Sequence, residues 1–207
     1  MPLDLHAIVD PSHTAVLTME LQRGVMGDLA MLPDLRDECT ATGMLDNVHD
    51  LLAAARTAGA RVVHCTAEFR EDRQGSGTNA PMLRASAKGG ALISGTPSAE
   101  VVPELDVQPS DLVVPRLHGM TPFTGTSLDA MLRNLAVKTV IATGVSVNVG
   151  VTGMVIEAVG LGYEVVVPPD AVAGLPREYA EAVLQHTIPV IAYRIPTAQI
   201  VETWQSP

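Results

Sequence analysis

Aromatic residues are scarce in this chain, which has two Phe, three Tyr and one Trp among 207 residues. A core must therefore be built from Val, Leu, Ile, Ala and Met, the residues that buried parallel sheets prefer. The hydrophobic fraction of 47% is sufficient for such a core. The length favours a single domain spanning residues 1–207.

Positive charge is also in short supply. Thirteen Lys and Arg stand against 23 Asp and Glu, which gives a formal net charge of −10. This balance argues against non-specific binding to nucleic acid or to an anionic membrane, but it says little about small-molecule substrates. The partner that we expect is a small-molecule substrate. No apolar run approaches the roughly 18 residues of a membrane helix. The N-terminus lacks the apolar core of a signal peptide, so we expect a cytoplasmic protein.

Only two cysteines, Cys39 and Cys65, are present, and their spacing matches no metal site. They are typical of reduced thiols in a cytosolic protein. The chain also lacks HExxH, Walker and GxGxxG patterns, so we predict neither a metal nor a cofactor.

Short apolar runs alternate with amphipathic stretches along the whole chain. Such alternation predicts an α/β fold, a three-layer α/β/α sandwich around a mostly parallel sheet. Strands are expected over residues 14–19, 61–65, 111–114, 140–142, 165–167 and 189–193. Helices are expected over 44–55 (ended by Gly59), from an N-cap at Thr126, over 151–158, from Pro176, and over 197–204.

A long polar segment, residues 68–108, interrupts this alternation and contains five glycines. Loops of that length in a compact domain are usually functional, so the segment predicts a lid or a binding loop. A short helix around residues 80–87 is expected within it.

The sequence GVSVNVG, residues 144–150, joins a predicted strand to a predicted helix. Open α/β sheets bind ligands at such a place, where a strand's carboxyl end meets a helix N-terminus. Backbone N–H groups of residues 148–151 could bind a carboxylate or an oxyanion. Alternatively, Ser146 or Asn148 could simply cap the helix.

Charged residues follow two of the predicted strands. Glu20, after the first strand, could be a general acid or base, or a solvated carboxylate. Arg116, after the third, could pair with Glu20 or hold an anionic substrate, or lie on the surface. In the loop that follows, His118 could act in proton transfer or be merely exposed. Phe123 could contact a ligand or pack beneath the loop.

Several segments together resemble the isochorismatase-like hydrolases, also called the cysteine hydrolase superfamily. AVLTMELQRG (15–24) is similar to the family's first strand, with Gln22 in the shared position. The segment 122–151 resembles its block leading to the Gly-Val loop, and GYEVVVPPDAVAG (162–174) resembles its fifth strand and Asp loop. The resemblance covers about residues 15–195.

The resemblance implies a six-stranded sheet of order 3-2-1-4-5-6, a homodimer or homotetramer, and a cis peptide bond at Val145–Ser146. It places the family's catalytic Asp, Lys and Cys at Glu20, Arg116 and Gly150, so this chain departs from the trio at all three positions. The substrate-binding positions that we expect are Gln22, His118, Phe123, Val145, Ser146 and Asn148.

Glycine at position 150 has no nucleophile, which excludes the thioester route there. True isochorismatases are similar in carrying Gly at this point, and hydrolyse a vinyl ether by acid catalysis. The first hypothesis is therefore a cysteine-independent hydrolase with a small anionic, vinyl ether-like substrate. A second is a catalytically inactive small-molecule-binding or structural member of the family. A third keeps a cysteine enzyme, with Cys65 as the nucleophile.

Overall fold

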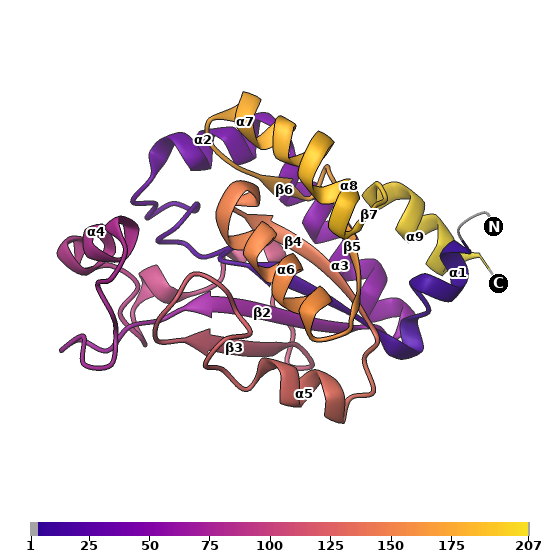
Figure 1. The fold of residues 1–207 in the computed structure, drawn as a ribbon, viewed down its shortest axis with the longest axis horizontal. Coiled ribbons are helices and arrows are strands. Elements are labelled where there is room, and N and C mark those ends of the chain that lie inside the picture. Colours follow the sequence, from indigo (N-terminus) through magenta and orange to yellow (C-terminus); the bar gives the residue numbers. More distant parts are fainter. Residues whose placement is uncertain (1–3, 207) are drawn as a thin grey trace.

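The computed structural model describes residues 4–206, which form one parallel sheet between two layers of helices (Figure 1). The path through the sheet is β3-β2-β1-β4-β5-β7, and the short β6 pairs with β4 beside that path. The strands are β1 (Thr14–Met19), β2 (Arg61–Ala67), β3 (Leu112–Arg116), β4 (Thr139–Val145), β5 (Glu164–Val167), β6 (Val172–Ala173) and β7 (Tyr193–Arg194). The expected fold and strand order are confirmed, with β7 as the sixth strand of the path.

Helices cover both faces of the sheet. One layer comprises α1 (Leu5–Ile8), α2 (Pro33–Ala41), α3 (Met44–Ala58) and α9 (Thr197–Gln205), and the other α5 (Leu128–Asn134), α6 (Thr152–Gly160), α7 (Arg177–Ala182) and α8 (Ile188–Ile191). The remaining helical segments are η1 (Pro11–His13), η2 (Pro97–Ala99), η3 (Pro103–Leu105), η4 (Val147–Val151) and η5 (Val183–Thr187). Within residues 4–206, no helix has both the length and the apolar character needed to cross a membrane.

Strand β1 divides the core between these two layers. Ala15, Leu17 and Met19 pack into the cluster formed with α5 and α6, whereas Val16 packs into the cluster formed with α3 and α9. This is the alternation that a strand imposes on successive side chains. Because every residue of β1 is buried, the strand lies at the centre of the molecule and its carboxyl end is held rigidly.

The strongest sequence patterns give the elements expected of them. Strand β1 has the predicted bounds, and α3 ends at Gly59, whose φ of 85° is the left-handed conformation that glycine adopts readily. Strands β2 and β3 each extend to residues beyond the predicted ends, to Ala67 and Arg116. Arg116 thus belongs to a strand rather than to a loop.

Two expectations were wrong in detail. Residues 188–191 form helix α8, and only Tyr193 and Arg194 form the last strand. Short apolar runs do not distinguish helix from strand, and here the helix leaves Val190 in solvent. In α5 the N-cap is Ser127, although the Thr126 hydroxyl still accepts a hydrogen bond from the Leu128 N–H at 3.1 Å.

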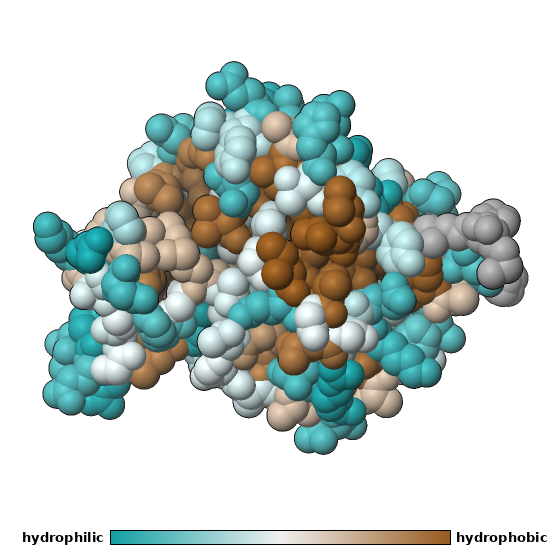
Figure 2. Space-filling model, viewed as in Figure 1, coloured by the Kyte–Doolittle hydropathy of each residue, from teal (hydrophilic) through white to brown (hydrophobic). Residues whose placement is uncertain are grey.

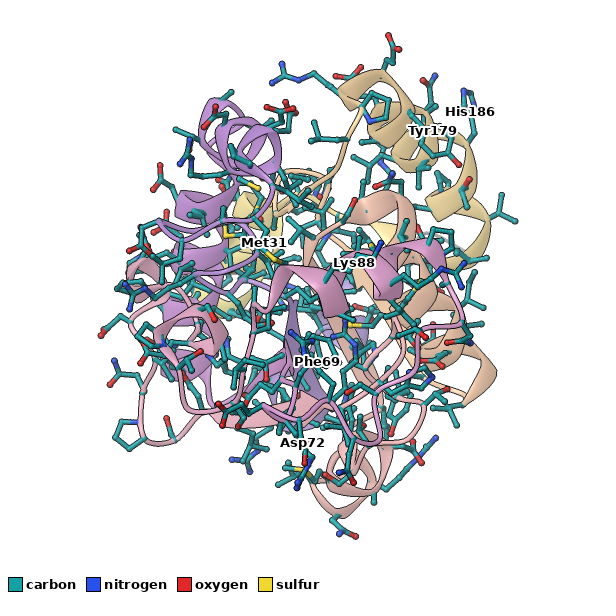
Figure 3. All side chains as sticks on the ribbon, turned by 90° about the vertical axis from the view of Figure 1, so that its left-hand side faces the viewer. Met31, Phe69, Asp72, Lys88, Tyr179 and His186 are labelled. Atoms are coloured by element: carbon teal, nitrogen blue, oxygen red, sulfur yellow. The ribbon has the colours of Figure 1, made fainter. Side chains whose placement is uncertain are left out.

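The segment 68–108 lies over the carboxyl ends of the strands, where its helix α4 (Pro81–Gly89) crosses the face seen in Figure 3. Phe69 and Leu92 anchor the segment in a small buried cluster with Ala67 of β2. The end of α4 packs near Met31, since a Cβ at Gly89 would lie 3.3 Å from the Met31 sulfur. The segment therefore covers the edge where a ligand site is expected.

Candidate active site

Glu20 occupies a strained position directly after β1. Its φ of 52° lies in the left-handed region, which residues with a Cβ rarely adopt. The Glu20 N–H donates to the Cys65 carbonyl at 3.0 Å, which ties this conformation to the end of β2. The side chain is 20% exposed. Backbone strain of this kind is concentrated at functional sites.

Arg116 contacts Glu20 from the other side of β2. It is the last residue of β3 and pairs in register with Ala67, so its side chain reaches past the end of β2 to the Glu20 carboxylate. Nη2 donates to Glu20 Oε1, and Nε donates to the Gly119 carbonyl at 3.2 Å. The two predicted residues are therefore brought together as an ion pair.

One nitrogen of this pair is left without a partner. Arg116 is only 5% exposed, and its Nη1 makes no hydrogen bond to any of residues 4–206. A buried donor without a partner is costly, and such groups are rare in native structures. Nη1 and Nη2 form a fork whose geometry suits a carboxylate or phosphate.

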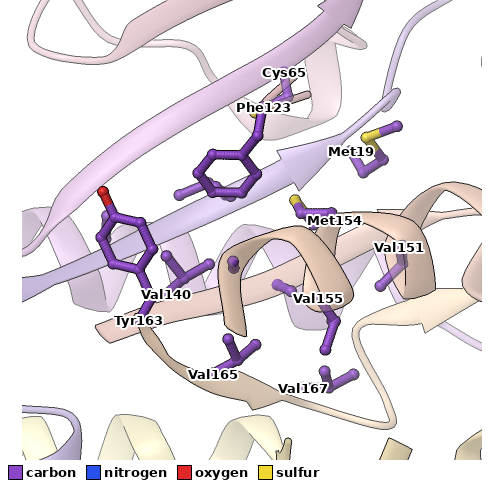
Figure 4. Packing of buried hydrophobic residues seen from close by; sticks show 14 of the residues in the cluster. Met19, Cys65, Phe123, Val140, Val151, Met154, Val155, Tyr163, Val165 and Val167 are labelled. Atoms are coloured by element: carbon purple, nitrogen blue, oxygen red, sulfur yellow. The ribbon is translucent and has the colours of Figure 1, made fainter. Parts of the chain in front are cut away.

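Gly150 faces the side chain of Met19. A Cβ at position 150 would lie 3.0 Å from the Met19 Cε and 3.3 Å from the Val145 carbonyl oxygen. Met19 is fully buried in the core cluster that Figure 4 shows. A cysteine at position 150 would thus require Met19 to move. The sequence offered one signal for this contact, because Met19 precedes Glu20 on the strand face that packs on α6.

The loop from Val145 to Val151 uses some of its backbone N–H groups within the loop itself. A cis peptide bond joins the buried Val145 to Ser146, as the resemblance implies. The N–H groups of Val149 and Val151 both donate to the Ser146 carbonyl, at 3.0 and 3.1 Å. Of the N–H groups of residues 148–151, which we predicted could bind an anion, those of Val149 and Val151 are therefore used within the η4 turn.

The polar side chains of this loop contact the loop after β6. The Ser146 hydroxyl donates to the Asn148 side-chain oxygen, and Asn148 Nδ2 donates to the Leu175 carbonyl at 2.9 Å. Gly174 has no room for a side chain, since a Cβ there would lie 2.7 Å from the Asn148 oxygen. Neither polar side chain caps α6, and both hold the two loops together.

Gln22 has a structural position. It is fully buried, and its side-chain nitrogen donates to the carbonyls of Ala67 and Ala99 at 3.0 and 2.7 Å. Its oxygen accepts from the Ala67 N–H at 2.8 Å. Gln22 therefore joins the ends of β1 and β2 to the covering segment, and all of its side-chain hydrogen bonds are to backbone groups.

His118 and Phe123 make contacts of other kinds. His118 is exposed, and its Nδ1 accepts from the Gly77 N–H at 3.1 Å, so it fastens the loop after β3 to the covering segment. Phe123 is buried in the core, with its ring centroid 5.9 Å from that of Tyr163 (Figure 4). Of the two interpretations of Phe123, packing beneath the loop is the one that the structure shows.

The cysteines are inert thiols. Cys65 lies in the packed core near Met19 and Phe123, and burial raises its pKa to about 12 (Figure 4). Burial likewise raises the pKa of Cys39 to about 12. A reactive cysteine needs a low pKa and access to substrate, so the structure contradicts the hypothesis of a Cys65 nucleophile.

A second buried polar cluster lies on the opposite face of the sheet, and the sequence gave little sign of it. Asp111 accepts from Arg56 Nη2 at 2.7 Å and lies 3.4 Å from His64 Nε2, and the Thr18 hydroxyl lies 2.9 Å from His64 Nδ1. Burial lowers the pKa of His64, so the ring is neutral at pH 7. The sequence signal was slight, since Thr18 and His64 are polar residues within short strands that are mostly apolar.

Five surface hollows of residues 4–206 are lined by residues other than Glu20 and Arg116. One of them, of about 160 Å³, is lined by Val147 and Gly174 of the loops described above. Across the described range, no three His, Cys, Asp or Glu side chains converge as metal ligands would.

The sequence of this chain is similar to a known domain family and to named proteins. The isochorismatase domain model matches residues 14–199. The isochorismatase family protein YwoC of Bacillus subtilis is 27% identical over 195 residues, which are 94% of this chain and 95% of YwoC. The ureidoacrylate amidohydrolase RutB of Rhizobium rhizogenes is 29% identical over 178 residues, with 78% of this chain and 70% of RutB covered.

A solved structure agrees with the fold. An isochorismatase family protein from Desulfovibrio vulgaris superposes with a TM-score of 0.78 at 22% identity, covering 93% of this chain and 98% of its own. The family match spans nearly all of the described residues, and the sheet order agrees with it. The chain therefore belongs to the isochorismatase family of hydrolases.

Proposed function

We propose that this protein hydrolyses a small anionic, vinyl ether-like substrate without a covalent intermediate. The observation that carries the proposal is the buried Arg116 Nη1, which lacks a partner beside the strained Glu20. An anionic group of the substrate would bind to this nitrogen, and Glu20 would transfer the proton. The loops over the pair would have to open to admit the substrate.

The lack of an available thiol supports this class of chemistry. Gly150 has no side chain, Met19 fills the adjacent space, and Cys65 is buried with a raised pKa. Water must then be the nucleophile, and it attacks a neutral vinyl ether only after the substrate is activated.

Protonation provides that activation. Glu20 is ion-paired with Arg116 before the substrate binds, so it takes up a proton from water when the substrate's anionic group replaces it at Arg116. It then donates this proton to the terminal vinyl carbon, and the ether-bearing carbon becomes an oxocarbenium ion. Water adds to that carbon and returns a proton to the Glu20 carboxylate. The resulting hemiketal breaks into a ketone and an alcohol. Arg116 stays charged throughout, so it binds the anion and takes no part in proton transfer.

Turnover of defined substrates tests this function. Purified protein is offered isochorismate and a simple anionic enol ether, and also ureidoacrylate, the substrate class in the name of the relative RutB. We expect release of the keto product from the enol ethers, lowered about 10²–10⁴-fold by Glu20→Ala. Glu104→Ala removes an exposed carboxylate elsewhere and serves as the matched control. Turnover confined to ureidoacrylate, or unimpaired in Glu20→Ala, would contradict the proposal.

A second candidate is a binding protein that does no chemistry. The closed Glu20–Arg116 contact favours it, because a carboxylate held by a guanidinium is occupied before any substrate arrives. In that case the same compounds should raise the melting temperature and be recovered intact. Consumption of a stabilising compound would exclude this candidate.

A further inference from the structure

The covering segment, residues 68–108, has a loosely attached tip, residues 74–91. Leu83 is the only buried residue of the tip, and the others are partly or fully exposed. Helix α4 of the tip lies in front of the strand ends in Figure 3, and mostly hydrophilic residues occupy the end of the molecule in Figure 2 where Figure 1 places α4. An element with so little buried apolar surface opens at a low free-energy cost.

The backbone at both ends of the tip is suited to a hinge. Arg73 and Gly75 at one end have φ values of 54° and 87°. Gly90 and Leu92 at the other end have φ values of 66° and 58°. The left-handed conformation is strained for the two residues with a Cβ, and such strain is concentrated at segments that switch. Because the Arg73 guanidinium donates to the Ala91 carbonyl at 2.8 Å, the two hinges lie side by side.

Two hydrogen bonds, which we call the latch, hold the tip to the loop after β3. Ser76 Oγ donates to the Leu117 carbonyl at 2.8 Å, and the Gly77 N–H donates to His118 Nδ1 at 3.1 Å. Within residues 4–206, these are the only hydrogen bonds that join the tip to a residue outside the covering segment. The closed position of the tip therefore depends on this loop.

The same loop supports the guanidinium of Arg116. The carbonyl of Gly119, the residue after His118, accepts from Arg116 Nε at 3.2 Å. The far side of the loop is closely packed, because a Cβ at Gly153 of α6 would lie 2.5 Å from the Thr121 Cγ2. Movement at the latch is thus transmitted toward Arg116 rather than along the loop.

The closed position also has a cost. Ser86 lies one turn after the buried Leu83, on the inner side of α4, and its hydroxyl is buried with no hydrogen-bond partner among residues 4–206. An unpaired buried hydroxyl favours the open position, in which water can bind it. A small change at the latch should therefore shift the balance between open and closed.

We infer that residues 74–91 are a lid that opens at these two hinges, and that its closure is coupled to the position of Arg116 through residues 117–119. The inference rests on the proposed function only for the nature of the ligand, an anion that binds Arg116 and so favours the closed lid. Coupling of this kind is reciprocal, so closure of the lid would also hold Arg116 in its binding position.

Alkylation of a thiol placed under the lid measures its opening in the full chain. Ser86→Cys puts a thiol in place of the buried hydroxyl. Cys39 and Cys65 are buried with a pKa of about 12, so they stay unreacted. We expect slow alkylation by iodoacetamide, followed by the mass of the intact chain. Circular dichroism checks that each variant is folded.

Loss of the latch should speed this alkylation. In the Ser86→Cys background, His118→Ala and Ser76→Ala should each raise the rate about 2–10-fold, the effect of one lost hydrogen bond. His49→Ala, at an exposed histidine of α3, is the matched control and should leave the rate unchanged. Tryptic cleavage after the exposed Lys88 of α4 should accelerate in the same two variants, and this readout needs no new thiol.

Coupling is measured at Arg116 itself. Arg116→Lys keeps a positive charge beside Glu20 but removes the Nε–H that the Gly119 carbonyl accepts. It should raise the alkylation rate by a similar factor. Combined with His118→Ala it should raise the rate by less than the product of the two, because both act through one loop. Arg194→Lys, at an exposed position, should change nothing.

Three results would overturn the inference. The first is a rate that both latch variants leave unchanged, and the second is a rate that His49→Ala raises equally. The third is a double variant that equals the product, since Arg116 and the latch would then act separately. No substrate is needed, so an absence of hydrolysis would contradict the proposed function and leave the lid and its coupling in place.

Discussion

Two buried clusters of charged side chains lie on opposite faces of the same sheet, and they differ in how completely they are paired. In the Arg56–Asp111–His64 cluster, no buried side-chain nitrogen or oxygen lacks a partner. In the Glu20–Arg116 pair, Nη1 of the arginine has none. The first cluster also has ordinary backbone geometry, whereas the second includes a residue at a φ of 52°.

This difference separates a group that maintains the fold from a group prepared for a ligand. A fully paired buried network contributes rigidity. Removing one member leaves the remaining polar groups buried without a partner. An incomplete network carries a cost that only another molecule can remove. We therefore assign stability to the Asp111 cluster and binding to the Arg116 pair, and each prediction below probes that division.

The largest effect is expected at Asp111. Asp111→Ala leaves Arg56 without its carboxylate and should lower the free energy of unfolding by about 3–5 kcal/mol. Urea unfolding followed by circular dichroism measures the loss. Asp46→Ala, at an exposed aspartate in the first turn of α3, should cost no more than about 1 kcal/mol. Equal losses in the two variants would remove the distinction between a buried network and a surface charge.

A smaller effect is expected where the candidate site is tightly packed. Gly150→Ala forces Met19 aside and should cost about 1–3 kcal/mol, as overpacking does. Gly160→Ala, at the end of α6 with free space around its Cβ, should cost nothing or stabilise. In a Met19→Val background the cost of Gly150→Ala should shrink, which a double-mutant cycle measures. An unchanged cost would show that Met19 is not the obstacle.

Acid should weaken the paired cluster through His64. Burial lowers the pKa of His64 in the folded state, so the unfolded chain binds the proton first. The stability is complete above the unfolded value of about 6.5 and is lost as the pH falls below it, by up to about 1.4 kcal/mol per pH unit. Unfolding free energies between pH 7.5 and pH 5 should show this slope, and His64→Gln should flatten it. His49→Gln, at an exposed histidine, should not.

The Asp111 carboxyl extends the same dependence to lower pH. Its burial opposes ionisation, but hydrogen bonds from Arg56 and the Gln108 N–H outweigh that effect, and the pKa lies below its ordinary value. Its contribution is therefore present above pH 4 and lost as the pH falls further.

The smallest effect is expected from anions at Arg116. A small carboxylate that binds Nη1 should stabilise the fold by about 1 kcal/mol at a few times its Kd. Arg116→Gln should abolish this response, measured as a thermal shift, whereas Arg194→Gln at an exposed position should keep it. If Arg56→Gln abolished the thermal shift and Arg116→Gln did not, the anion would bind at the Asp111 cluster, which would contradict this assignment.

The fold followed from local patterns because each strong pattern was also required by the core. The apolar residues of 14–19 fit only a buried strand, and those of α3 fit only an amphipathic helix. Both elements formed as expected. The short apolar run 189–193 could form either a strand or a helix. The helix formed, and it buries Ile188 in the core. Local sequence could not supply that tertiary contact.

The sequence predicted that Glu20 and Arg116 could pair, but it did not predict the contacts around them. The positions of Glu20 and Arg116 after β1 and at the end of β3 brought them to one edge, as parallel strands require. The roles of Met19, Gln22 and Asp111 depend on neighbours more than 40 residues away in the chain. No spacing rule within the sequence encodes such contacts.

The most direct test of the role assigned to the Glu20–Arg116 pair is hydrolysis. Wild type, Glu20→Ala and Cys65→Ser are each offered isochorismate and a simple anionic enol ether. The account predicts release of the keto product by wild type, unchanged in Cys65→Ser and lowered about 10²–10⁴-fold in Glu20→Ala. Full activity in Glu20→Ala, or a loss confined to Cys65→Ser, would contradict it.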